Sequence, residues 1–294
     1  MPSTREIRRR IVSVKKTAQI TSAMEKVAQA KMARAQQAAL AGRPYAELMN
    51  RVLGEVVSHA GDFDHPFMKA RGGENRALIL VTTDKGMCGS INSNLLRKVT
   101  NEFVTDHTRV IAAGRKGAQH TARVGWNLAA EFPYSDTPVF SEARAIARMA
   151  VELFENAEVD HVDIAFTNFV NTLTQKPEVQ TLLPITEIKG VQAGVEGEEM
   201  ATELPGGTAE FLFEPSAGGV LGALLPHYIN FQVHQILLEA KASEFSSKMV
   251  AMKNATDNAN DLIKDLTLEF NKMRQAAITN ELLEITTAQM ALGN

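Results

Sequence analysis

Near both ends of the chain, mostly apolar and small side chains recur at steps of three or four residues, with one wider step between Glu244 and Met252. Near the N-terminus the stripe consists of Ile7, Ile11, Val14, Ala18, Thr21, Met24, Ala28, Met32, Ala35 and Ala39. Near the C-terminus it consists of Val233, Leu237, Ala240, Glu244, Met252, Ala255, Ala259, Leu262, Leu266, Phe270, Met273 and Ala277. A repeat near 3.5 residues is typical of helices that pack along one seam. We therefore expect two long helices that bury their stripes on each other as an antiparallel coiled coil.

Proline positions indicate where these helices begin and break. Arg43-Pro44 predicts a kink or a new helix start, because Tyr45 and Leu48 resume the apolar pattern. No proline follows Pro226. The C-terminal helix is therefore predicted to be roughly 100 Å long, too long to fit inside a compact globular domain.

Between the two ends the period changes to that of strands alternating with helices. Buried strands are predicted at 77–83, 110–114 and 162–169, and a fourth strand at 178–184 pairs with the third as a hairpin. Helices are predicted at 89–105, 115–124 and 141–157. Such alternation favours a small, largely parallel sheet.

The predicted fold class is α/β, with a long antiparallel coiled coil and a small, mostly parallel Rossmann-like domain. The expected organisation is an N-terminal coiled-coil helix (1–58), a connecting loop (59–75), the α/β domain (76–189), an acidic linker (190–215) and a C-terminal coiled-coil helix (216–294). The linker prediction rests on the Gly- and Glu-rich composition of 190–207.

Charge is unevenly distributed, although the chain has a net charge of only −3. Residues 1–58 hold 11 Lys and Arg against 4 Asp and Glu. This basic segment suits nucleic acid, an anionic membrane surface or acidic protein loops. Residues 1–44 contain no aromatic side chain for base stacking, so a basic outer face of the coiled coil is favoured over nucleic-acid binding. No apolar run approaches the roughly 18 residues of a membrane span.

The stretch LVTTDKGMCGS (80–90) has the strand, glycine turn and helix order of many nucleotide sites. It lacks both the G-x-G-x-x-G and the G-x-x-x-x-G-K-[ST] patterns, and Lys85 precedes the glycines. We expect a structural corner in which Gly86 and Gly89 form the turn, Ser90 caps the helix and Cys88 is buried. The residues predict no catalytic, cofactor or metal site; His59, Asp62, Asp64 and His65 are interpreted as a solvated loop.

Three stretches together resemble a known family. IRRRIVSVKKTAQITSAMEKVAQAKMARAQ and KMVAMKNATDNANDLIKDLTLEFNKMRQAAITNELLEI are similar to the terminal helices of the γ subunits of bacterial F-type ATP synthases. DKGMCGSIN resembles the first strand-to-helix turn of that family's central domain. The resemblance implies a central rotor shaft inside a ring of three α and three β subunits. An ε subunit and the membrane ring of c subunits are the other implied partners, and the β subunits carry the catalysis.

The resemblance also implies which residues contact the β subunits. Arg274 and Gln275 match the family's R-Q-A-x-I-T motif, with Thr279 following, and Met24 in SAMEKV matches the contact with the acidic β lever. The neighbouring polar cluster maps onto Glu244 and Lys248, where Lys248 stands in place of the common Arg. The implied location is the cytoplasmic face of the bacterial inner membrane, peripheral through the c-ring.

The residues alone also leave two other functions open. A static coiled-coil scaffold with a small domain is one alternative, and it predicts stable homodimers. A small α/β enzyme with helical arms is another, and it predicts ligand binding near Asp84–Ser90.

Overall fold

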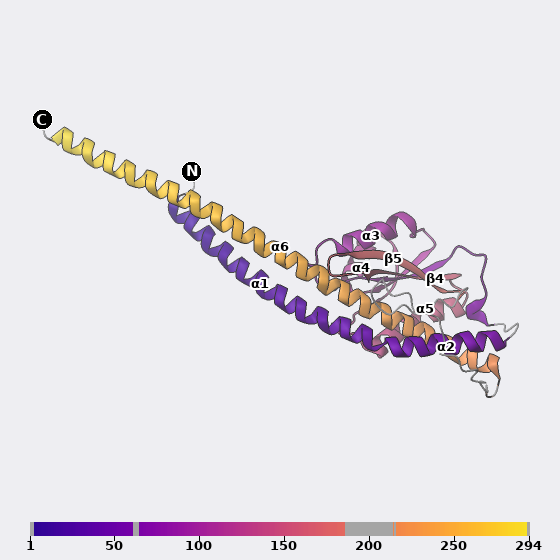
Figure 1. Cartoon of the computed structure of the whole chain (residues 1–294). Helices are drawn as coiled ribbons and strands as arrows, with labels where there is room; N and C mark the ends of the chain where they lie inside the picture. Colours follow the sequence, from indigo (N-terminus) through magenta and orange to yellow (C-terminus); the bar gives the residue numbers. More distant parts are fainter. Residues whose placement is uncertain (1–2, 61–64, 186–213, 215, 293–294) are drawn as a thin grey trace. The chain divides into compact units, whose positions relative to one another are not determined.

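A computed structural model describes residues 3–60, 65–185, 214 and 216–292. The elements run α1 (Thr4–Ala41), α2 (Arg43–Ala60), η1 (Pro66–Met68), β1 (Arg76–Val81), α3 (Ile91–Glu102), β2 (Thr108–Ala113), α4 (Arg115–Val124), β3 (Asn127–Phe132), α5 (Phe140–Glu155), β4 (His161–Phe169), β5 (Gln175–Leu183) and α6 (Ala217–Leu292). Figure 1 follows them from the N-terminus to the C-terminus. The chain forms two compact units, Met1–Val27 with Met249–Asn294, and Ala28–Lys248.

The first unit is an antiparallel helical pair made by the beginning of α1 and the end of α6 (Figure 1). The hydroxyls of Thr21 and Thr256 lie 2.7 Å apart and set the register of the pair. In an antiparallel pair, this register brings Ala18 opposite Ala259, and both are buried. The small side chains at the seam let the two helices approach closely, as the predicted coiled coil requires.

The seam on α6 differs from the predicted stripe at one step. Leu262 is 47% exposed, whereas its neighbour Ile263 is half-buried. The stripe that α6 actually buries steps by three and then four residues through Thr256, Ala259 and Ile263. Both Leu262 and Ile263 are apolar, so hydrophobicity alone did not separate them. Ala277, the last predicted member, is exposed because α1 does not extend along that part of α6.

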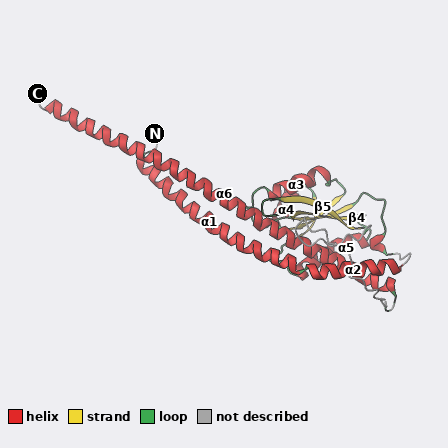
Figure 2. Ribbon diagram, in the orientation of Figure 1, coloured by secondary structure: helices red, strands yellow, loops and turns green. Residues whose placement is uncertain are grey.

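The second unit contains a five-stranded sheet of order β3-β2-β1-β4-β5. Strands β1 to β4 are parallel to one another, and β5 returns antiparallel to β4. The pairing of Phe169 with Gln175 closes the predicted hairpin. Strand β3 was not predicted: it is an edge strand whose residues are exposed or half-buried, so it lacks the buried apolar run that marked the other strands. The fold is thus the expected α/β class, with the parallel strands and flanking helices visible in Figure 2.

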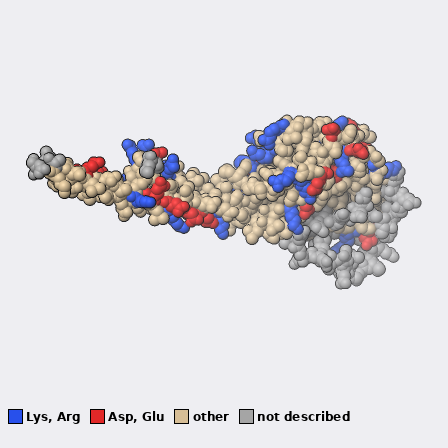
Figure 3. Space-filling model, turned by 90° about the horizontal axis from the view of Figure 1, so that it is seen from above, with Lys and Arg blue, Asp and Glu red and all other residues tan. Residues whose placement is uncertain are grey.

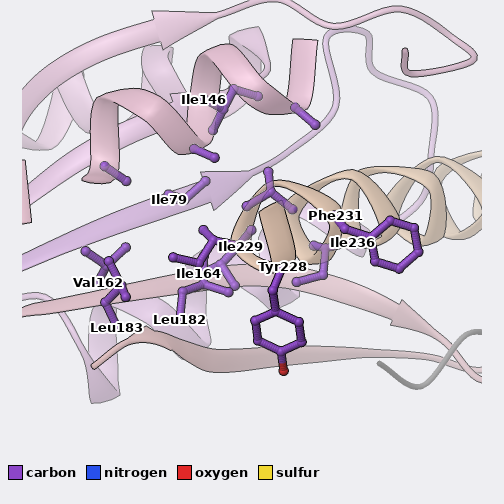
Figure 4. Close-up of a cluster of buried hydrophobic side chains, with 14 of the residues drawn as sticks. Ile79, Ile146, Val162, Ile164, Leu182, Leu183, Tyr228, Ile229, Phe231 and Ile236 are labelled. Atoms are coloured by element: carbon purple, nitrogen blue, oxygen red, sulfur yellow. The ribbon is translucent and has the colours of Figure 1, made fainter. Parts of the chain in front are cut away.

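Alternate residues of β1 face the two sides of the sheet, as the pleat of a strand requires. Leu78 and Leu80 pack under α3, whereas Ile79 belongs to the larger core on the other face. Figure 4 shows Ile79 and Ile164 of the sheet beside Ile146 of α5 and Ile229 of α6. One face of the sheet is therefore closed by α5 and the first part of α6, together with α2.

Between Tyr228 and Lys248, α6 is buried on all sides, unlike an ordinary amphipathic helix. No residue between Tyr228 and Lys248 is exposed. The predicted stripe at Val233, Leu237 and Ala240 is buried, but so are most of the residues between its members. This part of α6 is therefore a core element of the α/β unit.

Two further predictions concern the start of α2 and the segment after β5. Helix α1 ends at Ala41 and α2 begins at Arg43, so Arg43-Pro44 marks a new start, as predicted. The proposed acidic linker (190–215) lies outside the described residues except for Glu214, as do Asp62 and Asp64 of the predicted solvated loop. Among the helices that the structure describes, none is long and apolar enough to cross a membrane.

Candidate functional site

The turn after β1 is a rigid corner that is held to α6. The predicted turn residues Gly86 and Gly89 both lie in this turn, and its positive φ angles occur at Met87 (62°) and Gly89 (62°). The Ser247 hydroxyl of α6 donates a 2.7 Å hydrogen bond to the Cys88 carbonyl. A side chain at Gly89 would come within 3.2 Å of the same Ser247 oxygen, which explains the glycine. Ser247 thus takes the space next to this turn, where a ligand would otherwise approach.

The rest of the same turn confirms one expectation and corrects another. Cys88 is buried, with its sulfur 3.5 Å from the Asn92 amide, as predicted for a small apolar side chain. Ser90 occupies the N-cap position of α3 but makes no side-chain cap hydrogen bond. Its hydroxyl instead accepts a hydrogen bond from the Asn94 amide. Within the described residues, no group of three or more potential ligands could hold a metal ion.

Glu244 and Lys248, two of the residues implied by the family resemblance, are bonded to each other inside the second unit. The Glu244 carboxylate accepts from Lys248 at 3.1 Å and from Lys241 at 3.0 Å. The side chains of Lys241 and Glu244 are only 2% and 4% exposed, whereas that of Lys248 is 13% exposed. Both oxygens of Glu244 are therefore engaged within the chain, and Lys248 is the member of the group that reaches solvent.

The loop after β3 brings further polar groups to the same part of α6. The Lys241 ammonium lies 4.2 Å from the centre of the Tyr134 ring, and burial raises the pKa of Tyr134 well above its ordinary value. Asp136, in the same loop, pairs with Lys31 of α1. The hydrogen bond from Lys31 holds the pKa of Asp136 below its usual value. Nothing in the sequence singles out Lys241, Tyr134 and Asp136, because a charged or hydroxylated residue in a loop or helix carries no sequence signal of burial.

Glu239, one turn before this group, has an unusual titration. Burial raises the pKa of Glu239 from 4.5 to about 7, the hydrogen bond from Gln235 opposes this rise, and the charge of Glu178 adds to it. The folded carboxyl therefore keeps its proton between about pH 4.5 and pH 7, while the unfolded one has lost it. The free energy of unfolding is expected to fall as pH rises through this window, because ionising the carboxyl in the folded protein is unfavourable.

Glu239→Gln is expected to remove this pH dependence. The variant should be more stable than the wild type by about 1–3 kcal/mol at about pH 8, with little difference at about pH 4. Urea unfolding at both pH values measures the effect, with Glu269→Gln at an exposed position of α6 as control. Equal gains at both pH values would argue against the raised pKa as the cause.

The remaining implied residues lie on the helical pair of the first unit. Arg274, Gln275 and Thr279 are exposed on adjoining turns of α6, and the Thr279 hydroxyl donates to the Gln275 carbonyl at 3.0 Å. Met24 is half-buried on α1. The basic side chains near the start of α1 are all exposed, as expected for the outer face of a coiled coil: Arg8, Arg9, Arg10, Lys15 and Lys16.

The end of α6 is an uncovered apolar helix. Every residue from Arg274 to Met290 is exposed. The large apolar side chains of this stretch are 50–77% exposed, and they are Ile278, Leu282, Leu283, Ile285 and Met290. Charged side chains are sparse there, as Figure 3 shows for one face. Exposed apolar side chains that lie close together usually mark a binding site for a partner.

The chain is similar in sequence and in structure to known proteins. A family model described as ATP synthase matches residues 3–292. An ATP synthase gamma chain from Opitutus terrae is 48% identical over 99% of both chains, and one from Methylacidiphilum infernorum is 42% identical over the full length of both. Among solved structures, a chain of the Euglena gracilis mitochondrial ATP synthase (OSCP/F1/c-ring) aligns over 98% of this chain, with a TM-score of 0.65 and 18% identity.

A second solved structure has the same fold. A chain from the central stalk and c-ring of the Tetrahymena thermophila mitochondrial ATP synthase covers 80% of this chain with a TM-score of 0.58 and 25% identity. The matches extend over both the helices and the α/β unit. On the identity and coverage of the bacterial relatives, this chain belongs to the ATP synthase gamma chain family.

Proposed function

We propose that the chain is the central rotor shaft of the F1 sector of a proton-translocating ATP synthase. Its 48% identity to a gamma chain over almost its whole length carries this conclusion. In this role the chain couples rotation of the c-ring to conformational changes of three β subunits, which alternate with three α subunits around it. The static scaffold is not favoured, because the similar chains are gamma chains and the structural neighbours belong to rotor and stalk assemblies.

The exposed end of α6 supports a bearing within that ring. A rotating shaft needs a smooth surface that forms few strong bonds, and the apolar side chains between Ile278 and Met290 offer such a surface. Arg274 and Gln275 precede it and present hydrogen-bond donors to a β subunit. The shaft itself performs no chemistry in this proposal; the β subunits hydrolyse and form ATP.

Met24 and Lys248 are proposed to contact the β subunits through interactions other than those of Arg274 and Gln275. Met24 and the basic face of α1 meet an acidic element of β, an attraction that salt screens and that does not lock the shaft in one position. Lys248 is the group that reaches the partner, whereas the buried Glu244 holds Lys248 in place. The ε subunit and the c-ring bind the α/β unit, which makes the chain peripheral to the cytoplasmic face of the inner membrane.

Arg274→Ala tests the proposed contact at the end of the shaft. A hydrogen bond to a charged group contributes about 1.5–3 kcal/mol. We expect the rate of ATP hydrolysis by the assembled complex to fall at least about threefold. The reason is that the lost hydrogen bond no longer contributes its energy to the conformational change of the β subunit. Stability of the isolated chain should not change, since Arg274 is exposed.

Lys272→Ala is the matched control, an exposed basic residue on another face of the same turn. Both variants are assayed in purified complexes, together with rotation of a probe attached to the chain. Wild-type activity in Arg274→Ala would contradict the role of this residue. A wild-type chain that does not rotate during ATP hydrolysis would contradict the rotor itself.

A further inference from the structure

The α/β unit contains the kind of crevice in which related sheets bind ligands. The chain passes from β1 to β2 and β3 on one side, then crosses to β4 on the other side of β1. The carboxyl ends of β1 and β4 therefore flank a topological switch point. In open α/β sheets, ligands bind in the crevice outside the strands at that point.

Two adjacent serines of α6 occupy this crevice. Ser247 donates to the Cys88 carbonyl in the turn after β1, at 2.7 Å. Ser246 donates to the Thr172 carbonyl in the turn after β4, also at 2.7 Å, and accepts a longer hydrogen bond of 3.4 Å from Gln175. The cavity that remains beside Ser247 measures about 30 Å³, which is room for a water molecule and not for a nucleotide. The chain's own helix therefore stands where a ligand would bind.

Among the described residues of this unit, the other hydrogen bonds from α6 to neighbouring segments are longer, from His234 to the Pro138 carbonyl at 3.2 Å and from Gln235 to the Ala39 carbonyl at 3.4 Å. Much of the surface of α6 in this unit packs through apolar side chains such as Val233 and Leu237. Apolar packing depends on buried area and has little directional preference. Hydrogen bonds are directional and weaken steeply when the angle or the distance changes. Because consecutive helical residues differ by about 100° in direction, Ser246 and Ser247 reach two different turns only at one rotational setting of the helix.

We propose that Ser246 and Ser247 form a switch-point joint that fixes the rotational setting of α6 within the α/β unit. This proposal rests on the rotor function, because it assigns the joint the task of passing torque from the α/β unit to the shaft helix. The joint makes the connection torsionally stiff, so that little rotation is lost as twist between the unit and the helix. The glycine at position 89 is part of it, since it lets Ser247 approach the turn.

The test measures torsional fluctuation in the assembled complex. A gold nanorod is attached through Arg123→Cys, an exposed position on α4, while a non-hydrolysable ATP analogue halts the complex. In the double variant Ser246→Ala/Ser247→Ala, the variance of the nanorod angle is expected to rise about twofold, because two directional bonds are lost. The single variant Ser247→Thr keeps a hydroxyl at this position, so the nanorod angle should retain the wild-type variance.

Ser243→Ala is a closely matched control. Ser243 lies on the same helix and is fully buried, and its hydroxyl has no hydrogen-bond partner among the described residues. Its removal should leave the variance unchanged. Wild-type variance in the double variant, or an equal rise in Ser243→Ala, would overturn the joint. The rotor function is tested separately, by replacing the analogue with ATP. If the nanorod on the wild-type chain then does not rotate, the rotor function fails, and the joint fails with it. If the nanorod rotates but the double variant has the wild-type variance, only the joint fails.

Discussion

Replacing Glu244 with alanine is expected to lower the free energy of unfolding by about 3–5 kcal/mol, because it leaves a buried charge without its partner. Lys241 is 2% exposed and donates its hydrogen bond to Glu244 at 3.0 Å. Without the carboxylate, its ammonium group would lie buried near the positive charge of Lys248. The lost attraction is smaller than the cost of keeping the unpaired Lys241 out of water.

Urea unfolding of the full chain measures this loss, and two further variants identify its cause. Lys241→Met combined with Glu244→Leu removes the buried charges together and should recover most of the stability. Asp261→Ala removes one partner of an exposed pair on the same helix and should not change the unfolding midpoint detectably. If the double replacement is as unstable as Glu244→Ala, packing rather than the unpaired charge explains the effect.

Gly114→Ala is expected to destabilise the chain by at least about 3 kcal/mol, since it combines backbone strain with a clash that cannot relax. Gly114 lies between β2 and α4 with φ 103°, in a region that L-residues avoid. An added Cβ atom would lie 2.2 Å from the Thr82 carbonyl oxygen of the neighbouring strand end. Thr82 is itself held by its backbone hydrogen bond to Ala113, so the clash would separate β1 from β2 at this edge.

Gly125→Ala separates the two contributions to that loss. Gly125 also has a positive φ, of 81°, but nothing lies within 4 Å of its added Cβ atom. It should therefore cost only the conformational penalty of about 1–2 kcal/mol. The two variants are compared by urea unfolding under the same conditions. Equal losses would show that the approach of the Thr82 carbonyl is unimportant.

The fold was largely predictable because its main elements carry strong periodic signals. The steps of three and four residues from Ile7 to Ala39 identify α1 as a helix with one buried seam, and Arg43-Pro44 marks where α2 begins. Buried apolar runs identify the central strands. Strand β3 was missed because it is an edge strand whose residues are exposed or half-buried. Such a strand does not need a run of buried apolar residues. Leu262 was misplaced because a second apolar residue adjoins it.

The polar interior of the second unit was not predictable in the same way. The run from Lys241 to Lys248 includes several charged and hydroxylated side chains, a composition typical of a solvated helix face. Only the tertiary structure shows that the loops after β1, β3 and β4 surround it. Glu244 was selected through the family resemblance, whereas Ser246 and Ser247 gave no signal at all, because serine is common on exposed helices.

In the proposed rotor, one copy of this chain stands within a ring of catalytic subunits. The most direct measurement is native mass spectrometry of the tagged chain purified from membranes, with ATP hydrolysis assayed on the same sample. We expect one copy of the chain for three α and three β subunits in a complex that hydrolyses ATP. A homo-oligomer of the chain, without these subunits and inactive towards ATP, would contradict the rotor function.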